Sequence, residues 1–511
     1  MADGAEFIIF FVIIAIQGIA WVLKKSKTDP ASGLPAAPPP PPIPPDALDR
    51  LAARISDLEQ RTDDLRRVAQ GEGGRTAAVA DAIEDTIAPA LTHHRAEHQR
   101  LAQTVAQGVP ISAFAGPVHQ LLASIDRTWS RLQTLHTLIE ARRDPIVGDR
   151  LADGDAVGRA FWEPFAMLAS SEGLRVPTVE PISAPRGVLP ESVLIGALPG
   201  HPVVFVPQDF DAEIYRWTAV PHELAHVLYR SVPGLANEMR QRLRVGQQRG
   251  ILLNRRLQMH EVTQRLNSAW FEEWFCDWLT VLMCGAAGVR GLIEIFADQS
   301  EAMLTSAHLE ADGHYGPHPP PTLRVMVACA LLYRMGQDRE SIALLKEWQA
   351  RTGAHAMATI PTAHGAVRVP IRALFDTALH LANAWYETRW AALAGRTFSD
   401  IHGLEMTPGL WARVQDRIAD QRNGVEFVDD PRVVVCSAMM ARAESPGLAR
   451  TILQSTRRAI VGVGASLGEH RASGRRRRRR ASGAPTSRRR LFGEALVWTE
   501  VLRPVAGTPP S

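Results

Sequence analysis

Residues 220–229 read VPHELAHVLY, in which a glutamate and two histidines lie among apolar residues. In a helix, the spacing of His222 and His226 places both imidazoles on one face about one turn apart. Glu223, one position along, leans toward the same place from the side. The stretch is therefore either a zinc-binding catalytic helix or a core helix with coincidental polar residues.

Pro221 is compatible with a helix here. A start near Thr218 as N-cap places the proline in the first turn, where no intrahelical N–H is needed. The remaining positions are apolar, so we expect the helix to be buried. Buried histidines and a buried glutamate need partners, and a metal ion with its water would supply them.

A second segment, SAWFEEWFCDWLTVLMC (268–284), has a dense helical pattern that contains three acidic residues. A catalytic zinc ion needs a third protein ligand and an open fourth position. Glu273 and Asp277 are i, i+4, so one face presents Glu273 as the third ligand while Asp277 accepts the N–H of a ligating histidine. Glu272 points about 100° away, and we expect it to face solvent.

The three tryptophans of this segment share a four-residue step, which favours a core stripe over a substrate pocket. They are Trp270, Trp274 and Trp278.

His222-Glu223-x-x-His226 followed by Glu273-x-x-x-Asp277 resembles the gluzincin metallopeptidases. In that family a second helix gives the glutamate ligand and an aspartate one turn later holds a histidine. The resemblance implies Zn²⁺ as cofactor, a zincin-like fold, and hydrolysis of peptide bonds with Glu223 as general base.

A third element, HYGPHPPPTLRV (314–325), looks like the His-Pro…Arg element of the HtpX-like and CAAX prenyl protease branch. The likeness covers about residues 200–335. It implies that His314, Tyr315 or His318 donates to the developing oxyanion, while Arg324 orients the loop or holds substrate. His318 is the preferred catalytic donor, and its alternative is a cap for a helix that starts near Pro321.

These motifs favour a membrane-anchored zinc metalloendopeptidase that acts on a peptide or protein substrate. The alternative is a non-catalytic membrane scaffold with a structural or vestigial zincin domain. The peptidase requires a base and an open coordination position, and the scaffold requires neither.

The N-terminal region predicts a membrane tether. Residues 7–23 form an apolar run followed at once by lysines, which indicates an uncleaved single-pass anchor within 1–27 and a catalytic domain facing the cytoplasm. A buried core helix is the alternative. Residues 28–45 are a proline-rich linker.

Helical patterns fill residues 46–150. The first carries a coiled-coil seam, and it either joins chains into a homo-oligomer through residues 46–70 or packs on the rest of its own chain. His93, His94 and His98 are expected on a solvated face and are assigned no role.

Residues 151–445 are predicted to form the zincin-like domain, so the whole is α+β and predominantly helical. Runs 192–198 and 201–207 flank Pro199-Gly200 and predict a β-hairpin. Residues 446–511 are predicted to be an Arg-rich, disordered tail, either solvated or in contact with anionic lipid or nucleic acid.

The net charge of +3 predicts no protein-wide basic field. The four cysteines show no CxxC spacing and are predicted to be reduced core thiols.

Overall fold

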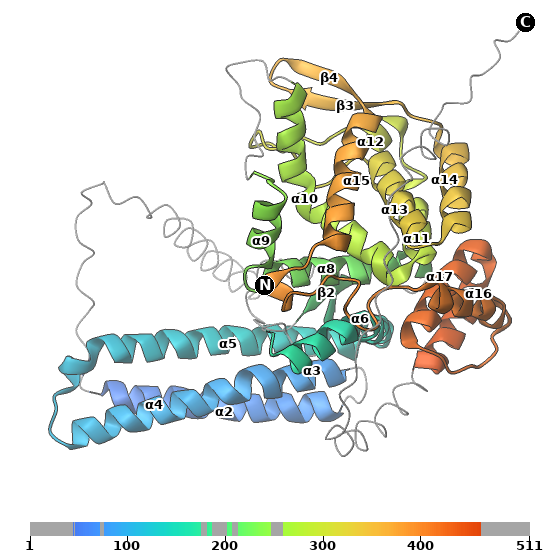
Figure 1. The fold of residues 1–511 in the computed structure, drawn as a ribbon. Helices are drawn as coiled ribbons and strands as arrows, with labels where there is room; N and C mark the ends of the chain where they lie inside the picture. Colours follow the sequence, from blue (N-terminus) through green and yellow to red (C-terminus); the bar gives the residue numbers. More distant parts are fainter. Residues whose placement is uncertain are drawn as a thin grey trace, which may run out of the picture.

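The computed structural model describes residues 44, 46–71, 76–174, 181–185, 202–206, 213–246 and 259–460. In these ranges the chain is predominantly helical, with two small two-stranded sheets, which confirms the predicted class in its coarse form (Figure 1). None of the helices described there has the length and apolarity to cross a bilayer. The predicted anchor and the Arg-rich tract lie outside the described residues, as does nearly all of the linker.

Residues 46–143 form an elongated bundle, here called the arm, which extends to one side in Figure 1. Its elements are α2 (Ala47–Gly71), α3 (Ala77–Ala82), η2 (Ile83–Ile87), α4 (Ala88–Ala106), η3 (Ile111–Phe114) and α5 (Ala115–Arg143). The helix α2 packs against α4 and α5, and its seam residues Leu51, Ile55 and Leu58 are buried there. The seam thus packs within its own chain, the second of the two alternatives.

The histidines of α4 do not share a solvated face as expected. His94 is 1% exposed, and its Nε2 lies 2.9 Å from the hydroxyl of Thr128 on α5. The Nε2 of His98 lies 3.0 Å from the carbonyl oxygen of Leu48. Both rings help to hold the arm together, because their polar atoms pair across neighbouring helices.

The rest of the described chain is here called the body, and it begins with α6 (Pro145–Glu172). Asp144 separates α5 from α6, and its carboxylate accepts the backbone N–H groups of Ile146 and Val147 as an N-cap. The helix therefore starts six residues before the predicted domain boundary at 151.

A parallel pair of strands joins arm and body. β1 (Ile182–Pro185) pairs with β2 (Val203–Val206). β2 confirms the second strand of the predicted hairpin, while residues 192–198 lie outside the described ranges. The two faces of the pair belong to different cores: Ile182, Ala184, Val203 and Phe205 pack with the arm, and Val204 and Val206 with the body.

A buried ion pair fixes this junction. Arg142 of α5 is 0% exposed and donates to both carboxylate oxygens of Asp155 on α6, each at 3.2 Å. The same guanidinium donates to the carbonyl oxygen of Ser183 on β1, and Asp155 accepts the Ser183 N–H at 2.6 Å. One ion pair thus ties the arm, the body and the sheet together.

The helix α10 (Met259–Cys284) belongs to the body (Figure 1). It packs against α8, α11, α13 and α15. Trp270, Trp274 and Trp278 are each at most 2% exposed, which confirms the predicted core stripe. The elements that surround it are η4 (Ile214–Thr218), α8 (Ala219–Ser231), α9 (Leu235–Arg242), α11 (Ala286–Phe296), α12 (Glu301–Thr305), α13 (Pro321–Arg334), α14 (Asp338–Thr352), β3 (Met357–Thr362), β4 (Gly365–Pro370), α15 (Ile371–Glu387) and η5 (Ala391–Leu393).

The chain then forms α16 (Pro408–Asn423), α17 (Pro431–Glu444), η6 (Pro446–Leu448) and a helix over 449–460. Ile452 and Thr456 of this last helix are completely buried, and Arg457 pairs with Asp153 of α6. The prediction of a disordered tail from residue 446 is therefore wrong for 446–460, because these residues supply apolar contacts to the body. All four cysteines are free and buried, as predicted.

Candidate metal centre

The helix α8 carries the two histidines and starts as predicted, with Pro221 in its first turn. Thr218 occupies the N-cap position as predicted, but its side chain forms no capping hydrogen bond, because η4 runs directly into α8 and gives Thr218 helical φ and ψ angles of −56° and −24°. Its hydroxyl donates to the carbonyl oxygen of Tyr215 instead. Gly291 of α11 lies against this start, where an added Cβ would be 2.3 Å from the Thr218 Cγ2.

The carboxylate of Glu273 lies between the two imidazoles. Its Oε2 is 3.3 Å from the Nε2 of His222, and its Oε1 is 3.1 Å from the Nε2 of His226. A tetrahedral zinc ion with bonds of 2.0–2.1 Å separates its ligand atoms by about 3.3 Å. Each imidazole Nε2 therefore lies at such a distance from one oxygen of the Glu273 carboxylate.

The Nδ1 atoms of both histidines face other carboxylates. His222 Nδ1 lies 3.1 Å from Asp277 Oδ1, as predicted for the partner of a ligating histidine. His226 Nδ1 lies 2.8 Å from Glu272 Oε1. With both Nδ1 atoms engaged, both Nε2 atoms remain for a metal ion.

The expectation that Glu272 faces solvent is wrong. Its side chain is 17% exposed and also accepts a hydrogen bond of 2.6 Å from Arg230 Nε. The facing helix α8 explains the difference, because it presents His226 and, one turn later, Arg230 to the same carboxylate. The i, i+4 spacing of His226 and Arg230 is the sequence signal for this contact, because it places an imidazole and a guanidinium on one helix face that can share one carboxylate.

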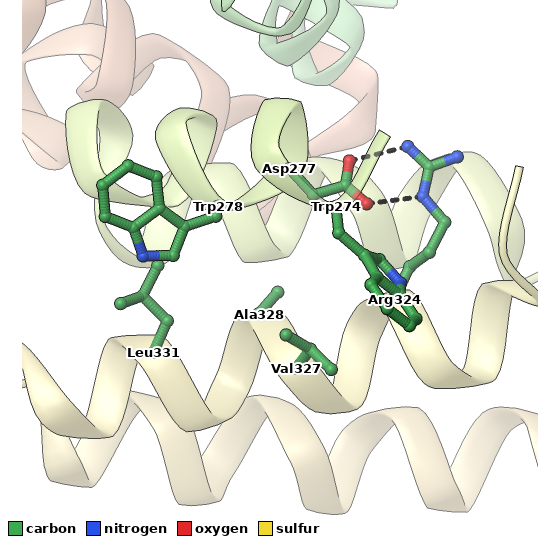
Figure 2. A pocket seen from close by; sticks show the side chains of 7 residues that line it. All are labelled: Trp274, Asp277, Trp278, Arg324, Val327, Ala328 and Leu331. Carbon is green, nitrogen blue, oxygen red and sulfur yellow. Dashed lines mark hydrogen bonds and ion pairs between the residues drawn. The ribbon is translucent and has the colours of Figure 1, made fainter. Parts of the chain in front are cut away.

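Asp277 is also held from the other side by Arg324 of α13. Arg324 donates from Nε and Nη2 to the two carboxylate oxygens, both at 2.6 Å (Figure 2). Behind this pair, α10 and α13 leave a small gap lined by Trp274, Trp278, Val327, Ala328 and Leu331 as well as the pair itself. The ion pair forms the polar wall between that space and the histidines.

The charges of the cluster shift its titration strongly. Burial alone would lower the pKa of His222, but the carboxylates of Asp277 and Glu273 raise it to about 10. Burial raises the pKa of Glu273, yet the imidazoles of His222, His226 and His318 hold it far below the usual value. In the absence of a metal ion, protons on the imidazoles thus provide the positive charge that this carboxylate needs.

One atom of the cluster lacks a conventional partner. Glu273 Oε2 is buried and forms no hydrogen bond with the described residues, although His222 Nε2 and His318 Nδ1 lie 3.3 and 3.0 Å away. A buried carboxylate oxygen without a donor is costly, and a cation would satisfy it. The buried group around His222 and His226 could therefore hold a metal ion.

Glu223 stands beside this cluster on α8. Its side chain is partly exposed, and among the described residues it forms no hydrogen bond and no ion pair. A carboxylate that is accessible and not committed to a partner is free to exchange a proton with a bound molecule.

The loop before α13 carries the remaining predicted residues, and it brings only one of its histidines to the cluster. His318 is 64% exposed, and its Nδ1 lies 3.0 Å from Glu273 Oε2. It does not cap α13, whose N-cap is Pro320. His314 pairs with Asp312 at 3.2 Å and is 52% exposed.

Tyr315 has a structural contact of its own. Its hydroxyl donates to the carbonyl oxygen of Pro361 on β3 at 2.9 Å, and burial raises the pKa of this phenol to about 12. The loop is further joined to β3 by the N–H of Ala307, which donates to the Thr359 carbonyl oxygen. Of the four candidates for substrate or oxyanion contacts, His318 and Arg324 lie at the cluster, and Arg324 uses its guanidinium on Asp277.

Cys276 offers a second way to complete the metal site, which the sequence did not indicate. One potential ligand atom from each of His222, His226 and Cys276 lies within 4.8 Å of the others, so this buried group could hold a metal ion. One Glu273 oxygen lies 3.1 Å from His226 Nε2, and the other lies 3.3 Å from His222 Nε2. Burial raises the pKa of the Cys276 thiol well above its usual value, which disfavours the thiolate that binds metal.

Comparison with known proteins finds no family model, no curated protein and no solved structure that matches the chain. The functional argument therefore depends on the geometry of the cluster and on the motifs.

Proposed function

We propose that the chain is a zinc-dependent metallopeptidase whose metal ligands are His222, His226 and Glu273. The observation that carries the proposal is the position of the Glu273 carboxylate, 3.3 and 3.1 Å from the two Nε2 atoms. The Nδ1 atoms of the same histidines face the carboxylates of Asp277 and Glu272. When bound, a zinc ion supplies Lewis-acid chemistry that polarises a carbonyl group and makes water easier to deprotonate.

The chain's own residues then handle protons and orientation. The Glu223 carboxylate takes a proton from the attacking water and returns it to the leaving amine. His318 is exposed beside Glu273 and donates to the carbonyl oxygen as negative charge develops there. Arg324 and Asp277 hold His222 in place, so Arg324 acts through other residues and does not touch substrate.

The tether belongs to the same proposal. Residues 7–23 would anchor the chain in a membrane, with the body on the cytoplasmic side, because the lysines follow the apolar run. The substrate is a peptide or protein that can reach a site partly open to solvent.

Two measurements on the full chain test the peptidase. The purified chain should bind one zinc ion, and His226→Ala should lose it. Glu223→Gln should keep the zinc ion and the fold but lose cleavage of a peptide library, because it removes the base and no ligand. Equal cleavage by Glu223→Gln and the unmodified chain would exclude Glu223 as the base.

The non-catalytic scaffold predicts a different result. It predicts no zinc-dependent cleavage by the unmodified chain with any peptide, even when the zinc ion is bound. The arm would then be the functional element, and the metal cluster would serve to stabilise the body.

A further inference from the structure

Glu272 of α10 joins the metal cluster to the surface of the molecule. Its Oε1 lies 2.8 Å from His226 Nδ1 and 2.6 Å from Arg230 Nε. The three side chains form a row of increasing exposure, with His226 13%, Glu272 17% and Arg230 56% exposed. The motifs in the sequence give Glu272 no role.

The chemical effect of this contact follows from the two nitrogens of imidazole. A neutral histidine carries its proton on one nitrogen and offers a lone pair on the other. A carboxylate at Nδ1 keeps the proton there, so that the lone pair of Nε2 is available to a bound metal ion. It also fixes the plane of the ring and makes Nε2 a stronger donor to a metal ion.

The two histidines are supported in different ways. His222 depends on Asp277, which Arg324 holds with two hydrogen bonds in the interior. His226 depends on Glu272, which is held by a single arginine at the surface. Removing Glu272 therefore leaves the Nδ1 atom of His226 without its carboxylate partner, whereas on the other side Arg324 still holds Asp277.

Arg230 and His226 lie one turn apart on α8, so the same helix presents the ligand and the residue that holds the ligand's partner. Because Arg230 is more than half exposed, water and salt weaken its pull on Glu272. Arg230 contributes to metal binding by limiting the orientations of the Glu272 side chain. This contribution to metal affinity is smaller than that of Glu272 itself.

We infer that Glu272 is a positioning residue of the metal centre, which holds His226 as an Nε2 donor and is itself oriented by Arg230. The inference rests on the proposed use of His226 as a metal ligand. It adds a residue that binds neither metal nor substrate but determines how tightly the metal ion is held.

The test is the zinc affinity of the full chain, measured by competition with a chromogenic chelator. Glu272→Gln keeps one acceptor oxygen but loses the charge, and Glu272→Ala loses both. Loss of such a partner typically weakens metal binding by about 10- to 100-fold, so we expect Glu272→Gln near the lower end and Glu272→Ala near the upper end. The graded order separates positioning from a general loss of packing.

Glu294→Gln is a matched control. Glu294 of α11 is 19% exposed and pairs with Arg290 and Arg351, and among the described residues it contacts no histidine. Its substitution removes a carboxylate of similar burial and should leave zinc affinity unchanged.

Arg230→Gln tests the outer contact. In the unmodified background it should weaken zinc binding by about two- to fivefold, the range expected for an exposed ion pair. In the Glu272→Gln background it should have no further effect, because Arg230 acts only through Glu272.

The outcomes separate this inference from the proposed function. If Glu272→Gln binds zinc within about twofold of the unmodified chain, the positioning role is refuted, whether or not the chain cleaves peptides. A chain that binds zinc, responds to Glu272→Gln and cleaves nothing refutes the peptidase and supports the positioning role. A chain that binds no zinc refutes both.

Discussion

Arg324→Met should be among the most destabilising single substitutions in the body. Arg324 and Asp277 are only 10% and 7% exposed, and their two hydrogen bonds of 2.6 Å replace the water that both charges gave up on folding. Removing the guanidinium leaves the Asp277 carboxylate buried, with His222 as its remaining partner. Breaking a buried ion pair in this way costs about 3–5 kcal/mol of unfolding free energy.

The assay is denaturant unfolding followed by the fluorescence of the buried tryptophans next to the pair, Trp274 and Trp278. Arg372→Met is the matched control, because Arg372 pairs with Asp376 at a similar distance of 2.8 Å but with side chains 44% and 54% exposed. Such a surface pair contributes at most about 1 kcal/mol. If Arg324→Met costs no more than Arg372→Met, the burial argument is refuted.

Three further predictions concern the ligand set, the arm and the start of α8. Glu273→Gln should weaken zinc binding more than Cys276→Ala does, because the Glu273 oxygens lie 3.3 and 3.1 Å from the two Nε2 atoms and burial disfavours the Cys276 thiolate; a near-ultraviolet thiolate band in the cobalt-substituted chain would reverse this order. Burial lowers the pKa of His94 to about 4, so as the pH drops this histidine is protonated in the unfolded chain before it is protonated in the folded chain. The free energy of unfolding should therefore fall between pH 6.5 and 4, by up to about 3 kcal/mol. Unfolding measured at several pH values should show a smaller fall for His94→Gln. Gly291→Ala should destabilise the chain by about 1–3 kcal/mol, because its Cβ would overlap Thr218, and Thr218→Ala should restore part of that loss in a thermal unfolding assay.

The metal cluster was largely predictable because helical periodicity determines which residues share a face. The i, i+4 spacing within α8 and within α10 placed both histidines, Glu273 and Asp277 correctly with respect to each other. The contact of Glu272 with His226 was not predicted, because the direction of its side chain depends on where the facing helix α8 lies, and the spacing within α10 does not reveal that. The alternative ligand Cys276 was missed for the same reason.

The ends of elements were predicted less well. Thr218 was expected to cap the start of a helix with its side chain. The preceding residues already form the short helix η4, which continues into α8, and the Thr218 side chain forms no capping hydrogen bond. The helix over 449–460 was predicted as part of a disordered tail, because arginine blocks dominate the composition of that end of the chain. Its few apolar residues are nevertheless buried against the body. Local composition is a weak guide where burial depends on contacts with distant segments.

The junction between arm and body gives the molecule a mechanical property. A single residue, Asp144, separates α5 from α6, and the buried Arg142–Asp155 pair clamps the same corner. The 29 residues of α5 form a helix about 43 Å long. It is connected to the body by one residue and by this buried ion pair. A force applied at the end of α5 far from the body would therefore act as a torque on β1 and β2. Because β2 packs against α8, this torque would reach the helix that carries both histidines.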